Sequence, residues 1–355
     1  MRILVLGGTA FLSAEIARQA VAAGHDVMCL ARGTRSAPPD GASWLQADRS
    51  QGPAAYAGAV HAGEWDAVID VARDPGEAQD ALEALAGLAR HWTFVSSCSV
   101  YADPSVPGTA EDDAVLPPLP AGTPATMENY GAAKSAIERL TMDLAGEKAH
   151  LCRPGLIGGP GDESDRYGYW PARFARDPGP VLVPDIPAAS TQIIDVRDLA
   201  AWLLTAAEQG VTGTLNAVGE PVPFAAYLEE SRRLAGEAAG EAAGEPSGAS
   251  AGETARVVAA PSDWLAARGV NYWAGPDSLP LWLPPGHEGF TTRSNAAARA
   301  AGLQLRPWPR TLADSLADER RRGLDRERKA GLSPDTEHRL LREFRAGAAS
   351  GAASG

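Results

Sequence analysis

The sequence predicts an α/β fold in which a doubly wound parallel sheet is followed by a smaller C-terminal, substrate-binding portion. Short apolar runs alternate with amphipathic helical segments over roughly the first 155 residues. Such runs are typical of parallel strands that helices cover on both faces. After Pro154 the alternation loosens, and the later part of the chain is rich in tryptophan and proline.

The first strand–helix–strand unit gives the clearest signal. Residues 2–6 (RILVL) form an apolar run that ends at a glycine pair. Residues 11–24 predict a helix, because apolar residues recur there at helical spacing before Gly24. Residues 25–33 (HDVMCLARG) predict a second buried strand.

The same alternation continues along the chain. Further strands are expected at residues 67–70, 92–96, 150–153, 191–194 and 214–218, and further helices at residues 77–88, 130–145, 171–176 and 196–208. This order of elements is that of a Rossmann-type, doubly wound nucleotide-binding fold.

The pattern also suggests how the chain is divided. We expect residues 1–155 to form the Rossmann core and residues 156–345 to complete the sheet and bind substrate. Residues 235–253 (AGEAAGEAAGEPSGASAGE) are of low complexity and predict a mobile surface insertion. Residues 346–355 predict a disordered tail, and a mixed-charge helical stretch is expected at 311–345.

Composition restricts the partners and the compartment. The net charge of −13 argues against a general nucleic-acid binder, which usually presents a positive surface. No apolar run approaches the length that spans a bilayer, and the N-terminus does not have the pattern of a signal peptide. The three cysteines cannot all pair, which favours a reducing, cytoplasmic location. The histidines lack metal-ligand spacing and no HExxH or CxxC occurs, so no metal site is expected.

The glycine turn after the first strand is a candidate cofactor site. A strand, a glycine turn and a helix start in succession place backbone N–H groups where a pyrophosphate can bind. The dinucleotide spacing Gly-x-x-Gly-x-x-Gly is occupied here by Gly7, Ala10 and Ser13, and both replacements are small. The alternative interpretation is the tight first turn that any parallel-sheet domain needs.

The end of the second strand predicts which cofactor is preferred. An acidic residue there would bind the ribose 2′-hydroxyl of NAD, whereas arginine accommodates the 2′-phosphate of NADP. The sequence has no carboxylate at this point but has Arg32 and Arg35, so NADP(H) is expected, with NAD(H) as the alternative. Two solvated loop cations are the competing interpretation.

A tyrosine and a lysine stand four residues apart, as Tyr130 and Lys134, in a chain with only three lysines. Residues at this spacing share one face of a helix. A nearby ammonium group favours the phenolate, so the tyrosine could exchange protons with a substrate near neutral pH. Ser97, after the strand at 92–96, could hydrogen-bond the reacting oxygen. The alternatives are an exposed helix pair and a serine that caps a turn.

These residues lie within a set of segments that resembles a known family. The segments are ILVLGGTAFLS, Asp48 in QADRS, FVSSCSVY, Tyr130–Lys134, CRPGLIGGPGD, QIIDVRDLA and TLNAVG. Together they resemble an extended short-chain dehydrogenase/reductase of the NAD-dependent epimerase/dehydratase type over roughly residues 1–220.

The resemblance implies roles for individual residues at the cofactor. The turn and helix start would line the pyrophosphate through Gly7, Thr9, Ala10, Phe11 and Leu12. Asp48 would contact the adenine, the backbone around Ala72 would pass the adenosine, and Pro154 would flank the nicotinamide.

The resemblance also implies catalytic and substrate residues. Ser97 matches the catalytic serine, Tyr130 would be the general acid/base, and Lys134 would bind the nicotinamide ribose and tune Tyr130. Ser99, Tyr169 and Arg173 are candidate substrate contacts. For the last two, aromatic packing beside a solvated arginine is the alternative.

Two features depart from the family pattern besides the replaced glycines. Tyr130 follows Ser97 by 33 residues, which is longer than usual, and the interval contains a proline-rich loop at 104–124. We interpret this loop as a lid or a substrate-shaping insertion. The substrate region has no unambiguous sugar-nucleotide signature.

The sequence therefore predicts an NADP-dependent oxidoreductase, epimerase or dehydratase. It would act by hydride transfer on a small hydroxyl- or carbonyl-bearing substrate, a sugar nucleotide being one candidate. A homodimer is one assembly that the resemblance implies. The alternative is a non-catalytic dinucleotide sensor or RNA-binding protein on the same scaffold, since some proteins with the GGTxFLx opening resemble chloroplast RNA-binding proteins. The serine–tyrosine–lysine set and the negative charge favour the enzyme.

Overall fold

The structure is a computed structural model that describes residues 1–243 and 255–352. The chain divides into two compact units with interleaved segments. Unit 1 holds residues 1–157, 192–220 and 289–306, and unit 2 holds the described residues of 158–191, 221–288 and 307–355. The sequence predicted a boundary near residue 155. The chain does leave unit 1 after residue 157, but residues 192–220 and 289–306 also belong to unit 1.

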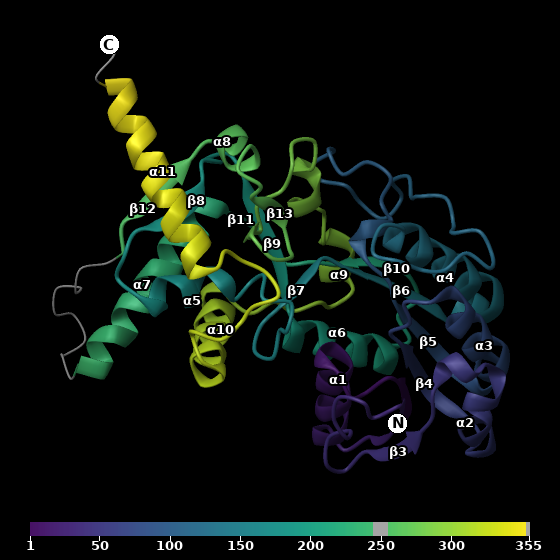
Figure 1. The fold of residues 1–355 in the computed structure, drawn as a ribbon. Coiled ribbons are helices and arrows are strands. Elements are labelled where there is room, and N and C mark those ends of the chain that lie inside the picture. The colour runs from purple at the N-terminus through teal and green to yellow at the C-terminus, as the bar shows by residue number, and fades with distance from the viewer. Residues whose placement is uncertain (244–254, 353–355) are drawn as a thin grey trace. The chain divides into compact units, whose positions relative to one another are not determined.

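Unit 1 is built on a parallel sheet, which confirms the predicted fold class (Figure 1). In the described residues its seven strands follow the order β10-β6-β5-β4-β1-β2-β3, and all neighbours are parallel. The bounds are β1 Arg2–Leu6, β2 Asp26–Ala31, β3 Ser43–Gln46, β4 Trp65–Asp70, β5 Ala89–Val95, β6 Ala149–Pro154 and β10 Gly213–Ala217. The chain order reverses at β1, and doubly wound sheets bind nucleotides beyond the carboxyl ends of the strands at such a point.

Helices cover both faces of this sheet. Helices α1 (Phe11–Ala22) and α6 (Val196–Gln209) pack side by side over one apolar cluster (Figure 1). Helices α3 (Pro75–Leu85) and α4 (Tyr130–Ala145) pack together over the other. The shorter helices of unit 1 are α2 Ala57–His61 and α9 Ala296–Ala300. Burial on both faces explains why β1 and its neighbours are apolar throughout rather than alternating.

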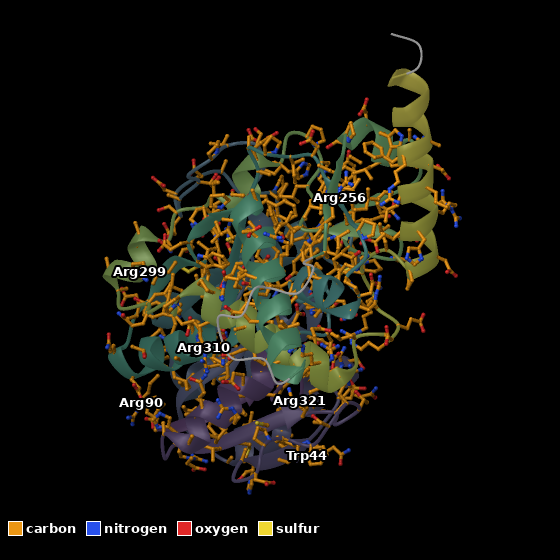
Figure 2. The ribbon with its side chains drawn as sticks, turned by 90° about the vertical axis from the view of Figure 1, so that its left-hand side faces the viewer. Trp44, Arg90, Arg256, Arg299, Arg310 and Arg321 are labelled. Carbon is orange, nitrogen blue, oxygen red and sulfur yellow. The ribbon has the colours of Figure 1, made fainter. Side chains whose placement is uncertain are left out.

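Strand β3 is an element that the sequence pattern did not predict. It forms one edge of the sheet and is mostly exposed, so its residues show no apolar run. Trp44 is 41% exposed (Figure 2) but donates its indole N–H to the carbonyl oxygen of Ala31 at 3.1 Å. An edge strand held in this way extends the sheet without a hydrophobic signature.

Unit 2 combines helices with short strands around an aromatic core. Its helices are α5 Tyr169–Arg176, α7 Phe224–Ala243, α8 Ser262–Ala266, α10 Trp308–Arg322 and α11 Pro334–Ala352. Its strands are β8 Val181–Pro184, β11 Pro221–Pro223, β12 Val257–Ala260, β13 Asn271–Trp273 and β14 Ser278–Pro280. The chain passes between the units within β7 (Leu156–Gly158) and β9 (Ser190–Asp195). The ring of Trp170 contacts those of Tyr169 and Phe224 edge-on.

Two segments that were expected to be mobile are partly helical. Helix α7 continues through residues 235–243, and helix α11 continues into the predicted tail as far as Ala352. Both segments are rich in alanine, the best helix former, and each extends a helix whose earlier turns are anchored by buried apolar side chains. The rest of both expectations falls on residues 244–254 and 353–355, which lie outside the described residues.

Among the described residues, no helix is both long enough and apolar enough to cross a membrane.

Candidate active site

The glycine turn after β1 is tightly packed against the sheet and leads directly into α1. Gly8 has φ of +99°, and a Cβ atom there would lie 2.4 Å from the sulfur of Cys29, so only glycine fits. Helix α1 begins after Ala10 with no side-chain cap and no acidic residue in its first turn. Its N–H groups and positive dipole end therefore remain available to an anion. The cofactor role of the turn stays a prediction; it named Gly7, and the structure adds that the turn requires glycine at position 8 as well.

The other replaced position of the dinucleotide spacing is Ser13. Its side chain is buried, and its hydroxyl donates a hydrogen bond to the carbonyl oxygen of Ala10 at 2.9 Å. Phe11 is half-buried against the core and Leu12 is buried, so these two would offer backbone rather than side-chain contacts to a cofactor. A small polar residue therefore substitutes for glycine at this point of the turn.

The arginines after β2 lie beside this turn. Arg32 and Arg35 are both exposed. The hydroxyl of Ser36 donates to the carbonyl oxygen of Thr9 at 2.9 Å and ties the loop to the glycine turn. The side chain of Gln46 donates to the carbonyl oxygen of Arg32 at 3.1 Å. Both cations are thus carried on an anchored loop and not on a free one.

Asp48 caps the turn that follows β3. Its carboxylate accepts hydrogen bonds from the backbone N–H and the hydroxyl of Ser50, at 3.1 and 2.9 Å. These hydrogen bonds, with a smaller contribution from the charge of Arg32, hold the pKa of Asp48 below its usual value. The carboxylate is thus kept ionised beside the carboxyl edge of the sheet.

An ion pair that the sequence analysis missed lies next to it. Arg49 donates to both carboxylate oxygens of Asp70, at 2.7 and 3.2 Å, and to the hydroxyl of Tyr56 at 2.9 Å. Asp70 is buried at the end of β4 and also accepts the N–H of Ala72 at 2.9 Å. A carboxylate that ends an apolar strand needs a partner, and this was the signal in the sequence. The pair fixes the backbone around Ala72.

Lys134 is buried beneath the site. It is 3% exposed, and its ammonium group donates to the carbonyl oxygens of Ala72 and Val95, both at 2.7 Å. These two bonds use two of its three N–H groups. Its Nζ lies 4.7 Å from the ring centroid of Phe94 and 5.8 Å from that of Tyr130. Burial lowers the pKa of Lys134 to about 7, although the charge of Asp70 opposes the shift.

The start of α4 packs directly on the turn after β5. A Cβ atom on Gly131 would lie 2.2 Å from the carbonyl oxygen of Ser99, so only glycine permits this approach. Half-buried Tyr130 is therefore carried to the turn that contains Ser97 and Ser99. The hydroxyl of Ser97 accepts the N–H of Ser99 and donates to its hydroxyl, each at 3.1 Å. The tertiary fold thus brings together the predicted serine, tyrosine and lysine.

A buried polar group supports this turn from below. Arg153, next to buried Pro154 at the end of β6, donates to both carboxylate oxygens of Glu138, at 2.9 and 2.8 Å. Ser96 donates to Glu138 at 2.5 Å, and Arg153 also donates to the hydroxyl of Tyr101 at 3.1 Å. The group ties α4, β5 and β6 together. Nothing in the sequence spacing predicted it.

The proline-rich loop between Ser97 and Tyr130 is attached at several points. The N–H of Leu119 donates to the carbonyl oxygen of Ala132, and the hydroxyl of Ser135 donates to that of Leu116. The N–H of Gly108 donates to the carbonyl oxygen of Thr292. These contacts attach the loop to α4 and to the segment at 289–306.

Of the two candidate substrate residues in α5, Tyr169 has the aromatic packing that was the alternative expectation, whereas Arg173 fits neither expectation. Tyr169 and Arg173 belong to α5 in unit 2 and are buried there. The side chain of Arg173 is 1% exposed and donates to the fully buried Glu337 at 2.5 Å. Arg173 is therefore neither a solvated cation nor a free substrate contact, because its charge is neutralised inside unit 2. Tyr169 accepts the N–H of Leu332 at 3.4 Å and packs in the aromatic core.

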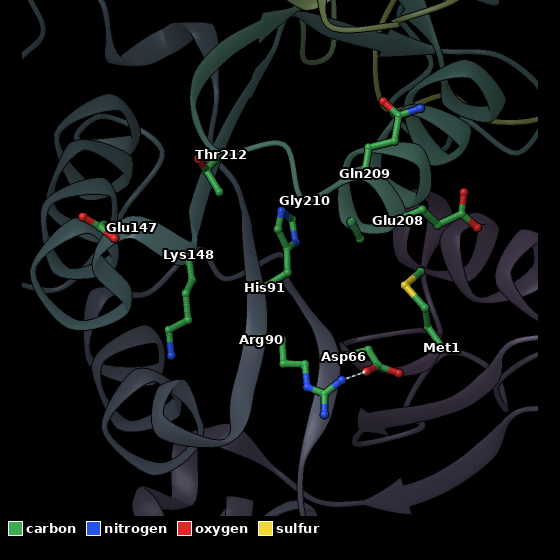
Figure 3. Close-up of a pocket in the computed structure, with 11 residues that line it drawn as sticks. Met1, Asp66, Arg90, His91, Glu147, Lys148, Glu208, Gln209, Gly210 and Thr212 are labelled. Carbon is green, nitrogen blue, oxygen red and sulfur yellow. Dashed lines mark hydrogen bonds and ion pairs between the residues drawn. The ribbon is translucent and has the colours of Figure 1, made fainter.

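A separate hollow lies at the amino-terminal edge of the sheet (Figure 3). Its lining includes Met1, Asp66, Arg90, His91 and Lys148 and none of the predicted site residues. Arg90 donates to Asp66 at 3.3 Å, and Lys148 donates to two backbone carbonyls. The hollow thus lies at the amino-terminal ends of the strands, whereas the candidate site lies at their carboxyl ends.

Comparison with known proteins supports the same interpretation. Residues 3–219 match the model of the NAD dependent epimerase/dehydratase family. A 2′-dehydrokanamycin reductase from Streptomyces kanamyceticus is 30% identical over 212 residues, and the match spans 57% of each chain. The chain thus matches little more than half the length of this curated relative.

Solved structures resemble the fold over a longer stretch. A putative epimerase from Burkholderia cenocepacia superposes with a TM-score of 0.67 at 20% identity, covering 90% of this chain and 98% of the other. A UDP-glucose 4-epimerase from Thermus thermophilus, solved in complex with NAD, gives 0.58 at 18% identity, covering 90% and 99%. At these identities the likeness concerns the fold.

The family match covers most of unit 1, including the glycine turn, the Ser97 turn and the Tyr130–Lys134 pair. It confirms the resemblance on which the sequence prediction depended. The chain belongs to the NAD-dependent epimerase/dehydratase family of extended short-chain dehydrogenases/reductases.

Proposed function

We propose that the protein is an NADP-dependent oxidoreductase, epimerase or dehydratase that acts on a small hydroxyl- or carbonyl-bearing substrate, with Tyr130 as general acid/base. The observation that carries the proposal is the packing of Gly131 on Ser99, which holds Tyr130 against the Ser97 turn while Lys134 lies buried below. Family membership and the reductase relative support the same chemistry.

The first unit would hold the dinucleotide along the carboxyl edge of its sheet. The uncapped start of α1 and the turn at Gly8 would receive the pyrophosphate. Asp48 and the backbone near Ala72 would lie along the adenosine, and Pro154 would flank the nicotinamide. When bound, the cofactor supplies hydride transfer at its nicotinamide ring. The protein contributes orientation and proton transfer.

Tyr130 would transfer the proton. Its hydroxyl would donate a proton to a substrate carbonyl oxygen, or accept one from a hydroxyl, while the Ser97 hydroxyl orients the same oxygen. Protonated Lys134 would place a positive charge 5.8 Å from the centre of this ring. The third N–H of Lys134 is the donor left for the nicotinamide ribose.

The preference for NADP over NAD depends on Arg32 and Arg35. The end of β2 has no carboxylate to bind a ribose 2′-hydroxyl, and both arginines are exposed on a loop anchored to the glycine turn. This arrangement suits a 2′-phosphate. We expect Arg32→Gln to weaken NADPH binding about tenfold, a loss of about 1.4 kcal/mol, and to leave NADH binding unchanged. Tighter binding of NADH than of NADPH by the wild type would contradict the proposal.

The catalytic role is tested with Tyr130→Phe. Loss of the phenol should lower kcat/KM by roughly 10²–10⁴-fold, while the Kd for NADPH changes little. Turnover is followed as NADPH oxidation or product formation on UDP-sugars, keto-sugars and dehydro-aminoglycosides. Tyr272→Phe, whose ring packs on Trp282 in unit 2, is the control and should keep its activity. Wild-type turnover in Tyr130→Phe would exclude the mechanism.

A further inference from the structure

Trp44 connects the exposed edge strand of unit 1 to the loop that carries Arg32 and Arg35. It is the second residue of β3 and is 41% exposed (Figure 2). Its indole N–H donates to the carbonyl oxygen of Ala31, the last residue of β2, at 3.1 Å. The N–H of Ala47 donates to the same oxygen at 3.3 Å. The end of β2 is therefore fixed at the point where the loop begins.

The ring of Trp44 also packs against the backbone of Gly33. A Cβ atom at this glycine would lie 2.2 Å from Cζ2 and 2.7 Å from Cη2 of the indole, so only glycine permits the contact. Gly33 has φ of +73°, a conformation that residues with a side chain rarely adopt. The residue that follows Arg32 thus combines a turn that needs glycine with a close contact to the indole, and the ring limits how far this turn can move.

Two hydrogen bonds hold the rest of the loop. The side chain of Gln46, on β3, donates to the carbonyl oxygen of Arg32 at 3.1 Å. The hydroxyl of Ser36 donates to the carbonyl oxygen of Thr9 at 2.9 Å. The loop is thus attached to β3 at its start and to the glycine turn at its end. Its backbone is held, whereas the side chain of Arg32 is exposed.

The charge of Arg32 acts on the carboxyl edge of the sheet. Hydrogen bonds from Ser50 lower the pKa of Asp48, and the charge of Arg32 adds to this shift. Burial raises the pKa of Glu77, in the first turn of α3, and the charges of Arg49 and Arg32 oppose that shift. These carboxylates follow β3 and β4, so the guanidinium is within electrostatic range of the strand ends where the candidate cofactor site lies.

We propose that Trp44 is a positioning residue for NADP: by holding the backbone of Ala31 and Gly33, it keeps Arg32 where its guanidinium would bind the 2′-phosphate. An arginine on an unanchored loop loses conformational freedom when it binds, and a loop that is already held reduces this cost. Trp44 acts through Arg32 and not by contact with the phosphate. The inference rests on the proposed function, to which it adds a residue on another strand that sets the preference for NADP over NAD.

The first test compares the affinities for the two cofactors. The Kd values for NADPH and NADH are measured by fluorescence titration for the wild type, Trp44→Leu, Arg32→Gln and the double variant. Trp44→Leu should weaken NADPH binding about fivefold and change NADH binding less than about twofold, because only NADPH carries the 2′-phosphate. The double variant should bind NADPH as weakly as Arg32→Gln, since the tryptophan acts through the arginine. Equal losses for the two cofactors would show a merely structural role and overturn the proposal.

Two further variants control for effects on folding. Trp44→Phe keeps an aromatic ring beside Gly33 and loses the indole N–H, so it should retain more NADPH affinity than Trp44→Leu. Trp264→Leu removes a tryptophan that packs on Phe344 in unit 2, and it should leave both Kd values unchanged. If Trp44→Phe binds NADPH as weakly as Trp44→Leu, the ring contact with Gly33 does not position Arg32.

The second test measures the loop without any cofactor. Trypsin cleaves after arginines on segments that open locally, so the rates of cleavage after Arg32 and Arg35 report how firmly the loop is held. Both rates should rise several-fold in Trp44→Leu, while cleavage after Arg256 in unit 2 should not change. Unchanged rates after Arg32 and Arg35 would mean that Trp44 does not hold the loop.

These outcomes separate the inference from the proposed function. If Arg32→Gln and Trp44→Leu both leave NADPH binding unchanged, the assignment of the 2′-phosphate site fails and the inference fails with it. If Arg32→Gln weakens NADPH binding and Trp44→Leu does not, the proposed function stands and the role of Trp44 is refuted. If both weaken NADPH binding selectively while Tyr130→Phe keeps full turnover, the catalytic part of the proposed function fails and the role of Trp44 stands.

Discussion

Lys134 shows how one residue can serve both structure and chemistry. Its ammonium group ties the end of β5, at Val95, to the backbone just after β4, at Ala72, and it lies under the ring of Tyr130. Burial favours the neutral amine, while the nearby carboxylates of Asp70 and Glu138 favour the charged form. The residue that we propose to tune the tyrosine is therefore itself close to losing its proton at neutral pH.

This placement predicts a pH dependence of stability. The pKa of Lys134 is about 7 in the folded protein and higher, near 10.5, when unfolded. Between these values the unfolded chain binds more protons, so the free energy of unfolding rises with pH by up to about 1.4 kcal/mol per unit. The free energy of unfolding of the wild type minus that of Lys134→Met, measured by urea unfolding, should therefore become more positive from pH 7 to pH 10. It should be constant below pH 6; a difference that does not change with pH would contradict the pKa shift.

At the scale of elements, the contact between the first turn and β2 positions the start of α1. Gly8 leaves no room for a side chain because Cys29 on β2 is buried directly against it. Any larger residue must push the turn away from the sheet. The helix end that would bind the pyrophosphate would then move with it.

Gly8→Ala should therefore weaken NADPH binding at least tenfold and destabilise the protein by about 2–4 kcal/mol, from clash and positive φ together. Gly24→Ala, also at positive φ (+80°) but with open space around it, is the control and should cost about 1 kcal/mol. The double variant Gly8→Ala with Cys29→Ala should recover part of the lost NADPH affinity. If Gly8→Ala and Gly24→Ala lower stability and NADPH binding equally, backbone strain alone explains the effect.

At the scale of the whole molecule, each of the two units is built from segments that are separated along the chain. Unit 1 needs residues 192–220 to supply α6 and the strand β10, which pairs with β6. Trp202 and its apolar neighbours in α6 are buried in the core cluster beneath the sheet. Unit 1 is therefore completed only after the chain has passed through part of unit 2.

The fragment 1–157 should consequently fail to fold cooperatively. It would expose the apolar face beneath α6 and an unpaired β6, and each large apolar side chain left unburied costs about 1.5–3 kcal/mol. Urea unfolding and near-ultraviolet circular dichroism of the fragment and the full chain provide the comparison. A transition of similar cooperativity in both would show that residues 1–157 form an independent domain.

Local sequence patterns predicted several helices and strands of this molecule. The periodicity of apolar residues predicted β1, α1 and α4 closely, and the four-residue spacing of Tyr130 and Lys134 marked the candidate site, because both signals lie within one element. The edge strand β3 has no such period, since most of its residues face solvent.

The pairing of distant charges was decided by the tertiary structure alone. Arg49 pairs with Asp70, 21 positions later in the chain, and Asn216 donates its N–H to Glu111, 105 positions earlier. Arg173 was expected to be solvated or to contact substrate, yet it is neutralised by Glu337 within unit 2. The sequence by itself determined which residue types were present and how each helix and strand would be patterned. Which charges meet, and which remain without a partner, depends on distances in space that only the folded chain sets.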